Sequence, residues 1–244
     1  MDNMKEVRFF YAPDAPTAME LPEEEAAHAV RVLRLEQGDE LMLADGRGTF
    51  YKAVITETTK KRCLYRIVET MPQLRQWQGH LHIAMAPTKN MDRTEWFAEK
   101  ATEIGFDELT FLCCKFSERK VIKTERIDKI LVSAMKQSHK AEKPRLNEMT
   151  DFMDFIVRDF PGDKYICHCY GDENEVELGG KRLLKDVLKK GGDALVLVGP
   201  EGDFSVDEVA AAEKAGFVPV SLGKSRLRTE TAALVAVHIM NLFN

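Results

Sequence analysis

Leu197-Val198-Gly199-Pro200-Glu201-Gly202-Asp203-Phe204 and Leu222-Gly223-Lys224-Ser225-Arg226-Leu227-Arg228-Thr229-Glu230-Thr231 are the two stretches that decide the fold. Each follows a short apolar run and opens a predicted helix. An α/β protein holds small ligands at strand-to-helix turns of this kind, where neighbouring parallel strands end. The pair therefore predicts a ligand pocket at one edge of a parallel sheet.

The chain around these turns alternates short apolar runs with helical patterns. The runs lack strict alternation of apolar and polar residues, as expected of strands that are buried on both faces. They occupy residues 81–86, 109–114, 165–170, 194–199 and 217–222. Strands that alternate with helices predict an α/β fold with a parallel sheet.

The last predicted helix, residues 229–243, is apolar on nearly all sides. A helix of this kind is buried on more than one side. It either crosses the core or packs against a second subunit, and we expect a homodimer.

The amino-terminal part reads as a small, mostly β domain over residues 1–72. Its strand-like runs are rich in β-branched and aromatic residues, and a helix that begins at Pro22 interrupts them. The runs are residues 7–11, 40–44, 49–57 and 62–68. Residues 73–79 contain proline and glycine without a clear period and form the predicted linker to a second domain, residues 80–244.

Composition indicates a cytoplasmic protein. No apolar run approaches the roughly 20 residues that span a bilayer, and residues 1–6 lack the apolar stretch of a signal peptide. Five cysteines in 244 residues do not suggest a disulfide framework. Cys167-His168-Cys169 lies in a predicted buried strand, where neighbouring side chains point to opposite faces, so no metal site is expected there.

The net charge of −5 does not by itself suggest a nucleic-acid partner, but its distribution is uneven. Residues 115–145 hold ten basic side chains against four acidic ones. Such a surface can supply phosphate contacts on an acidic protein. The alternative is a solvated helix with internal ion pairs, such as Glu125 with Lys129.

The chemistry of the two turns narrows the class of ligand. No Gly-Lys-Ser/Thr follows the first turn and the chain has no G-x-G-x-x-G, so neither a Walker loop nor a Rossmann fingerprint is present. In the second turn, Arg226 and Arg228 stand before a helix start, whose positive end disfavours them. Residues that oppose local preference are functional candidates.

Motifs in order along the chain resemble one known family. Leu-Val-Gly-Pro-Glu-Gly at 197–202 and Leu-Arg-Thr-Glu-Thr-Ala at 227–232 resemble the RsmE family of small-subunit (16S) ribosomal RNA uridine-N3 methyltransferases, within the SPOUT superfamily. His28 with residues 31–34 is similar to the amino-terminal motif of that family. Residues 102–105 and 117–119 are similar to motifs of its catalytic domain.

The resemblance implies an architecture and partners. A PUA-like β-barrel domain would precede a SPOUT domain that is tied in a deep trefoil knot and dimerises through the knot helices. The cofactor would be S-adenosylmethionine, and the partner would be ribosomal RNA of the small subunit. Neither a metal nor a membrane is expected.

The resemblance also implies roles for individual residues. The catalytic candidates are Arg228 and Glu230. The cofactor-binding candidates are Gly199, Glu201, Gly202, Leu222, Gly223 and Leu227, and the RNA-binding candidates are Arg31, Arg34, Arg119, Gln137 and Ser138.

Three departures from the family pattern fall on these motifs. Asp203 replaces a second glycine. Lys-Ser-Arg at 224–226 stands where Pro-Arg-Ile is usual. Lys-Gln-Ser-His-Lys at 136–140 replaces Glu-Gln-Ser-Gly-Arg, so RNA contacts there carry over only at Gln137 and Ser138.

Methylation at N3 requires a base, because the imide anion is the better nucleophile, and donors for the charge that spreads onto O2 and O4. We assign Glu230 to the first role, or to orienting Arg228, and Arg228 to the second. The alternative is that the two are structural partners of one another. Other classes are a non-catalytic RNA-binding protein with a degenerate methyltransferase domain, a SPOUT methyltransferase acting on another RNA, and a different α/β enzyme using a nucleotide or sugar phosphate.

Overall fold

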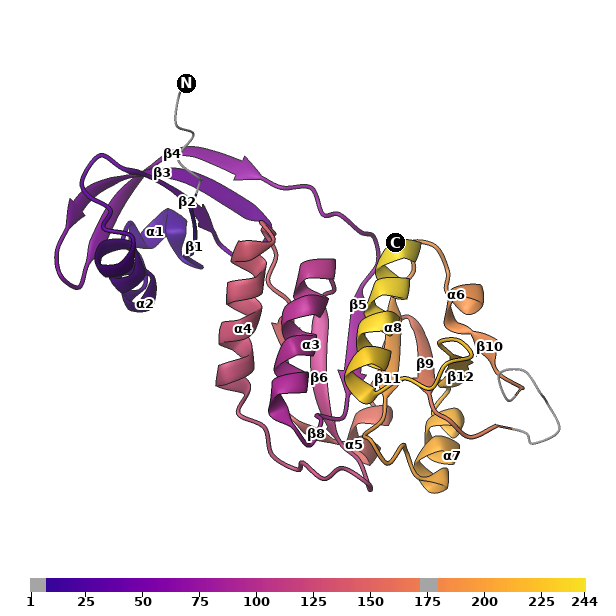
Figure 1. Ribbon diagram of the computed structural model, residues 1–244. Coiled ribbons are helices and arrows are strands. Elements are labelled where there is room, and N and C mark those ends of the chain that lie inside the picture. The colour runs from indigo at the N-terminus through magenta and orange to yellow at the C-terminus, as the bar shows by residue number, and fades with distance from the viewer. Residues whose placement is uncertain (1–7, 172–179) are drawn as a thin grey trace. The chain divides into compact units, whose positions relative to one another are not determined.

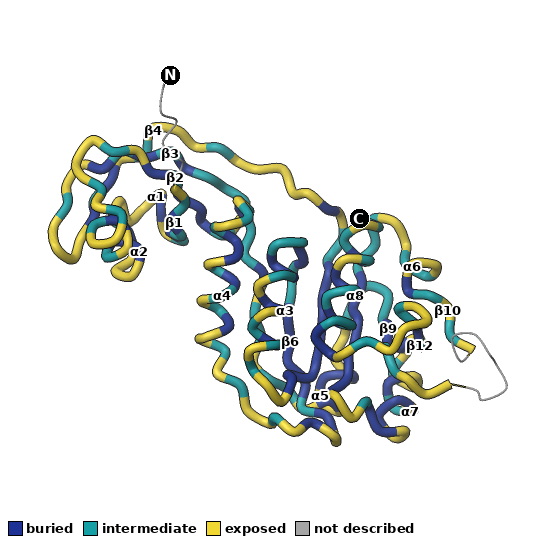
Figure 2. Tube along the Cα trace, viewed as in Figure 1, coloured by how far each residue is buried: buried dark blue, intermediate teal, exposed yellow. Residues whose placement is uncertain are grey.

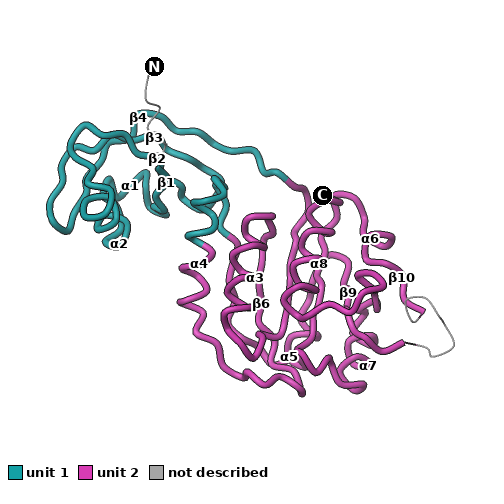
Figure 3. The backbone as a smooth tube through the Cα atoms, viewed as in Figure 1, with its two compact units in different colours: residues 1–76, 132–143 teal, residues 77–131, 144–244 magenta. Residues whose placement is uncertain are grey.

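The computed structural model describes residues 8–171 and 180–244, which form two compact units (Figure 3). The first comprises Met1–Gln76 together with Val132–Lys143, and the second comprises Trp77–Leu131 and Pro144–Asn244. The predicted linker, residues 73–79, contains the border between Gln76 and Trp77. The segment 132–143, which the sequence places in the second domain, groups with the first unit. The predicted domain limits stay a prediction.

The first unit is built on a four-stranded mixed sheet in the order β1-β2-β3-β4. The strand β1 runs parallel to β2, and the other neighbours are antiparallel. The strands are β1 (Phe9–Tyr11), β2 (Glu40–Ala44), β3 (Thr49–Thr58) and β4 (Cys63–Pro72). All four fall on predicted runs; Val7, the first residue of the predicted 7–11 strand, lies outside the described residues.

Short helices close one side of this sheet. They are α1 (Ala15–Ala18), α2 (Glu23–Ala27) and the π-helical turn η1 (His28–Val32). Pro22 occupies the position before the first turn of α2 rather than the predicted first helical position. The core under these helices contains Phe10, Leu41, Leu43 and Ile55, each at most 1% exposed.

The second unit is an α/β domain on a parallel sheet (Figure 1). The strand order is β10-β12-β9-β11-β5-β6-β7, with β8 pairing to β6, and among the described residues every pair of neighbouring strands is parallel. The strands are β5 (Leu81–Met85), β6 (Glu108–Cys113), β7 (Arg145–Leu146), β8 (Thr150–Asp151), β9 (Asp163–Cys167), β10 (Arg182–Leu183), β11 (Ala194–Val198) and β12 (Val218–Ser221).

Helices cover both faces of this sheet, which explains why its central strands lack alternation. All five residues of β5 and of β11 are buried, as Figure 2 shows in dark blue. One face packs against α3 (Met91–Ile104), α6 (Leu184–Val187), α8 (Thr229–Phe243) and the first half of α4 (Thr124–Gln137). The other face packs against α5 (Phe152–Ile156) and α7 (Val206–Lys214).

Local sequence signals fix where the helices begin. Ser205 and Glu208 form a capping box at the start of α7, with both reciprocal hydrogen bonds present. At α3 the cap is Asn90, whose side chain accepts from the Asp92 N–H. The predicted bounds of α8 are those observed.

The predicted fold class, a small β domain followed by a parallel-sheet α/β domain, is confirmed. The strand β12 pairs with β9 on the side away from β11. The helix α8, which follows β12, packs on α3, α6, β5 and β11, so the chain returns over the middle of the sheet. The knot that the resemblance implies stays a prediction. Within residues 8–171 and 180–244, no helix combines the length and apolarity needed to cross a membrane.

Candidate functional site

The two glycine-containing turns, after β11 and after β12, line one pocket of about 1030 Å³. It lies at the carboxyl ends of β9, β11 and β12 and reaches the first turn of α8. Because these strands are parallel neighbours, their outgoing loops meet at one edge of the sheet. Its lining includes Arg93, Gly199, Glu201, Gly223, Leu227 and Arg228.

The first turn is crowded, which accounts for its glycine. A Cβ on Gly199 would lie 3.1 Å from both the Cδ2 atom and the backbone nitrogen of Phe204. Gly202 is not among the pocket-lining residues; a Cβ there would lie 3.1 Å from Phe116 Cβ. Of the predicted first-turn residues, Gly199 and Glu201 therefore line the pocket and Gly202 does not.

Asp203 takes over the conformation that a glycine would supply. Its φ is +66°, in the left-handed region, which aspartate tolerates better than most residues. Its Oδ2 accepts from the Cys169 N–H at 2.7 Å and its Oδ1 from the Phe204 N–H at 2.8 Å. The departure from glycine at this position thus keeps the turn and ties it to the end of β9.

Glu201 is engaged with the loop that follows β5. Its Oε1 accepts from the Lys89 N–H at 2.8 Å. Arg119 donates to the Lys89 carbonyl at 2.7 Å and to the Thr88 carbonyl at 3.3 Å. Hydrogen bonds therefore join the loops that follow β5, β6 and β11. By holding the loop after β5, Arg119 has a positioning role in addition to the RNA contact that the sequence predicts.

The second turn is open and uses its backbone differently. Gly223 has a φ of +137°, and a Cβ there would meet nothing within 4 Å, so conformation rather than crowding requires glycine. The Ser221 hydroxyl accepts from the Gly223 N–H and donates to the Gly223 carbonyl. Leu222, Gly223 and Leu227 all line the pocket.

The two catalytic candidates lie at the end of this turn. Arg228 is exposed, occupies the position before the first turn of α8 and lines the pocket. Glu230 is buried at 7% exposure and does not line the pocket, and its Oε2 finds no hydrogen-bond partner among the described residues. Its Oε1 lies 3.6 Å from Nη1 of Arg93, which the sequence analysis missed. An arginine in the first turn of α3 opposes the helix dipole, the signal already used for Arg228.

The Cys167-His168-Cys169 segment also belongs to the pocket, which the sequence analysis did not foresee. The strand β9 ends at Cys167, Cys169 is exposed, and all three residues line the cavity, so the expected burial of this segment is wrong beyond Cys167. Burial, and then the charge of Lys181, lower the pKa of His168 to about 4. Lys181 donates to the His168 carbonyl at 2.7 Å.

Four of the five predicted RNA-binding residues lie in the first unit. Arg31 on η1 is exposed and donates to the Lys60 carbonyl at 3.3 Å, and Arg34 is exposed with a φ of +53°. Gln137 ends α4 and is exposed, whereas the Ser138 hydroxyl donates to the Ala134 carbonyl at 2.7 Å.

Comparison with known proteins finds two family models that match successive parts of the chain. A model of the RNA methyltransferase domain matches residues 75–241, and a model of the RNA methyltransferase PUA domain matches residues 21–68. Fold and site together define the class: an α/β RNA methyltransferase with a PUA domain.

Individual relatives narrow the class. The chain is 28% identical to ribosomal RNA small subunit methyltransferase E of Bacillus subtilis, over 92% of this chain and 89% of the relative. The crystal structure of a probable rRNA-methyltransferase from Porphyromonas gingivalis is 43% identical, with a TM-score of 0.85 over 97% of this chain and 99% of that one. A protein of Legionella pneumophila, solved with bound S-adenosylmethionine, is 27% identical with a TM-score of 0.85 over 97% and 98%. The chain belongs to the RsmE family of RNA methyltransferases.

Proposed function

We propose that the chain transfers a methyl group from S-adenosylmethionine to N3 of a uridine in small-subunit (16S) ribosomal RNA. The observation that carries the proposal is the single pocket formed by two distant turns, with Arg228 lining it and Glu230 two residues further along. The names of the curated relatives and the cofactor bound to the Legionella protein support the same assignment.

The residues of the pocket fit that cofactor. Its volume is at the upper end of the range for small-molecule sites. Because the site of Gly199 is crowded, no side chain is tolerated in that wall of the pocket. Leu222 and Leu227 supply apolar surface. Both turns carry glycine where backbone groups would face the ligand. We assign Gly199, Glu201, Gly223 and the two leucines to holding the cofactor, which when bound supplies an electrophilic methyl group on a positively charged sulfur.

The protein side of the chemistry falls to three charged side chains. Glu230 does not itself line the pocket, but it keeps one buried carboxylate oxygen unpartnered among the described residues, and we assign that oxygen to accept the proton from the uracil N3–H. Arg228 and Arg93 provide guanidinium donors for the negative charge that spreads onto O2 and O4. Among the described residues, Arg93 is the cation beside Glu230, and Arg228 lines the pocket, where we assign it to the substrate.

The RNA substrate places a further requirement on the site. Because N3 lies on the Watson–Crick edge, the target uridine must be unpaired or flipped out. We assign Arg31 and Arg34 to contacts with the RNA backbone, along with Arg119, Gln137 and Ser138. Replacing Arg31 with alanine should weaken binding of small ribosomal subunits and reduce the slope of log affinity against log salt by about one. An unchanged slope would remove Arg31 from the interface.

The homodimer is part of the same proposal. The helix α8 buries Ala233, Ala236, Val237 and Met240, but Leu242 is 69% exposed. Leu234, Val235 and Ile239 are only partly buried. An apolar helix with one side left uncovered fits a second copy of this chain. Sedimentation equilibrium of wild type and Leu242→Lys checks it: a monomeric wild type contradicts the proposal.

The test of the function uses small ribosomal subunits from a strain that lacks this enzyme. We expect wild-type protein to transfer labelled methyl groups from S-adenosylmethionine to one uridine, which mass spectrometry of nuclease digests locates. Binding of S-adenosylmethionine without transfer would indicate another RNA substrate. Absence of binding would favour a non-catalytic RNA-binding protein.

A further inference from the structure

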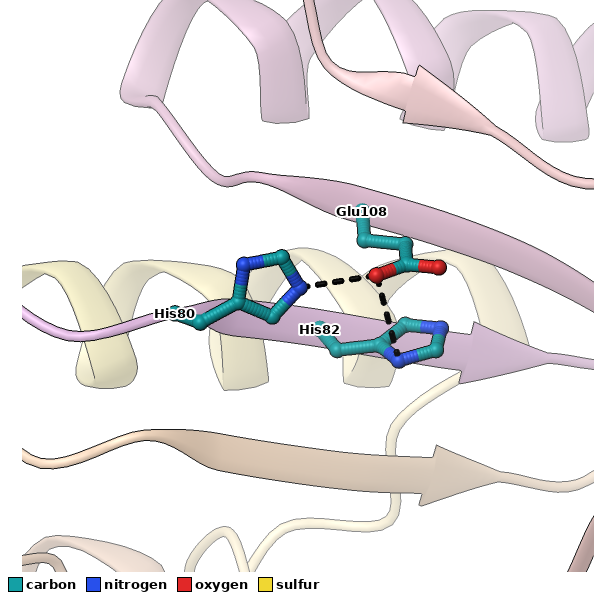
Figure 4. A group of neighbouring side chains, drawn as sticks. All are labelled: His80, His82 and Glu108. Atoms are coloured by element: carbon teal, nitrogen blue, oxygen red, sulfur yellow. Dashed lines mark hydrogen bonds and ion pairs between the residues drawn. The ribbon is translucent and has the colours of Figure 1, made fainter. Parts of the chain in front are cut away.

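The opposite edge of the parallel sheet carries a second cluster of functional side chains. His80 and His82 flank Leu81 at the start of β5, and Glu108 opens β6 (Figure 4). Alternate residues of an extended strand face the same side, and the β5–β6 register places Glu108 opposite His82. The ligand-type atoms of the three residues all lie within 4.8 Å of one another.

The distances are close to those of a metal site. His80 Nε2 lies 2.7 Å and His82 Nδ1 lies 3.9 Å from the same oxygen, Glu108 Oε2. With bonds of about 2.0–2.1 Å in tetrahedral geometry, ligand atoms lie roughly 3.3–3.4 Å apart. Reaching that spacing requires side-chain rotations and no change of register, and His80 is 39% exposed and has room to move.

An outer layer of hydrogen bonds already orients two of these ligands. Asn147 Nδ2 donates to Glu108 Oε1 at 2.6 Å and to the Thr110 hydroxyl at 2.8 Å. The same hydroxyl lies 2.9 Å from His82 Nε2. When Nε2–H donates to Thr110, the lone pair of Nδ1 faces the carboxylate, an arrangement that a cation between them stabilises. Metal-binding histidines are held by such outer partners.

The surrounding charges favour a cation. Asp193 Oδ1 accepts from the His80 N–H at 2.7 Å, and Asp107 Oδ2 accepts from the Leu81 N–H at 2.6 Å. Against these two carboxylates stands Arg145, whose Nε lies 4.0 Å from Glu108 Oε1 and whose side chain is 75% exposed. Because Arg145 is exposed to solvent, it offsets only part of the negative charge of Asp107 and Asp193, and the surroundings of the cluster remain negative.

We propose that His80, His82 and Glu108 bind one Zn²⁺ ion, with a solvent molecule as fourth ligand. Two imidazoles and one carboxylate suit zinc and similar transition ions, whereas magnesium and calcium prefer oxygen ligands. The ligands stand at the start of β5 and β6, and the pocket lies where strands of this sheet end. The ion therefore acts as a clamp between β5 and β6 and takes no part in methyl transfer.

The experiment titrates chelator-treated full-length protein with Zn²⁺ by calorimetry and with Co²⁺ by visible absorption. Wild type should bind one ion per chain, show the intense d–d bands of tetrahedral cobalt, and melt at a higher temperature with Zn²⁺. Glu108→Gln and His80→Gln should each lose more than about 100-fold in affinity, because each removes a direct ligand. His238→Gln, an exposed histidine on α8, is the matched control and should bind as wild type does.

Cys169→Ser separates this site from the pocket, where Cys167, His168 and Cys169 offer other soft ligands. It should leave Zn²⁺ affinity unchanged. The proposal is overturned if wild type binds no Zn²⁺, if the affinities of Glu108→Gln and His80→Gln equal that of wild type, or if only Cys169→Ser loses binding. The wild-type titration decides even if a variant fails to fold.

Discussion

The two edges of the parallel sheet differ in how their polar side chains are satisfied. At the amino edge these side chains contact one another, whereas at the carboxyl edge some keep buried atoms without a partner among the described residues. Glu230 keeps an unpartnered oxygen among the described residues, and burial lowers the pKa of His168 to about 4. Glu108, in contrast, is hydrogen-bonded on both oxygens, and His80 is the main cause that lowers its pKa to about 2. Unsatisfied buried groups are costly and persist where a ligand completes them, whereas satisfied networks hold a structure together.

The largest effect should come from Glu230→Gln, which keeps the shape of the side chain and removes its basicity. We expect methyl transfer at saturating cofactor to fall by about 10²–10⁴-fold, as for loss of a general base. Affinity for S-adenosylmethionine, measured by calorimetry, should change little.

Glu213→Gln on α7 is the control, since Glu213 is exposed and does not line the pocket. A wild-type rate for Glu230→Gln would leave Glu230 with a structural role only, and the comparison of the two edges would lose its main support.

Gly199→Ala should act on binding rather than on chemistry. The added Cβ would lie 3.1 Å from Phe204, so the first turn must shift, and overpacking of this kind costs about 1–3 kcal/mol. Affinity for S-adenosylmethionine should fall by roughly 5–150-fold, as calorimetry would measure.

Gly192→Ala is a matched control, because its Cβ would meet Lys189 at 3.2 Å, just before β11 begins. It should lower the melting temperature without changing cofactor affinity. Equal losses of affinity in the two variants would mean that the first turn is no more sensitive than any other tight loop.

Asn147→Ala tests the amino edge. It removes the donor to Glu108 and Thr110, so in the presence of a chelator the free energy of unfolding should fall by about 1–3 kcal/mol. Urea unfolding measures this, and cofactor affinity should remain that of wild type. A loss of cofactor affinity without a loss of stability would show that the two edges are coupled.

His168→Gln should give the smallest effect, and its sign follows from the lowered pKa. His168 has a pKa of about 4 in the folded protein against 6.5 for an unperturbed histidine. The unfolded chain therefore takes up the proton first, and wild type loses stability as pH falls from 6.5 towards 4.

The variant lacks this loss, and the two pKa values alone correspond to a shift of about 2 kcal/mol in the stability difference between pH 7 and pH 5. Because His168 is only partly buried, solvent screening should reduce the shift to roughly 1 kcal/mol. Urea unfolding at both values of pH measures it, with His238→Gln as control. A difference that does not depend on pH would place His168 in a more solvated setting.

Much of the fold could be predicted because periodicity reports burial locally. The runs 81–86 and 194–199 became β5 and β11, and the capping box at Ser205 appeared as written in the sequence. The pocket was predictable because it needs only that neighbouring parallel strands end at one edge.

Other features depend on pairing that no local pattern encodes. The His82–Glu108 register joins residues 26 apart, and the bond from Glu201 to Lys89 joins residues 112 apart. The spacing of His80 and His82 on one strand was a readable signal, but the carboxylate beside them came from another strand. Arg93 was missed for the same reason, since its partner Glu230 lies on the last helix.

The first turn of the pocket is held by hydrogen bonds to two other loops. Glu201 is tied to Lys89, and Asp203 to Cys169, so this wall moves only together with the loops after β5 and β9. The second turn is exposed from Gly223 to Arg226, and a Cβ on Gly223 would meet nothing within 4 Å. A ligand that enters the pocket therefore meets an exposed second turn on one side and, on the other, a first turn whose position two other loops fix.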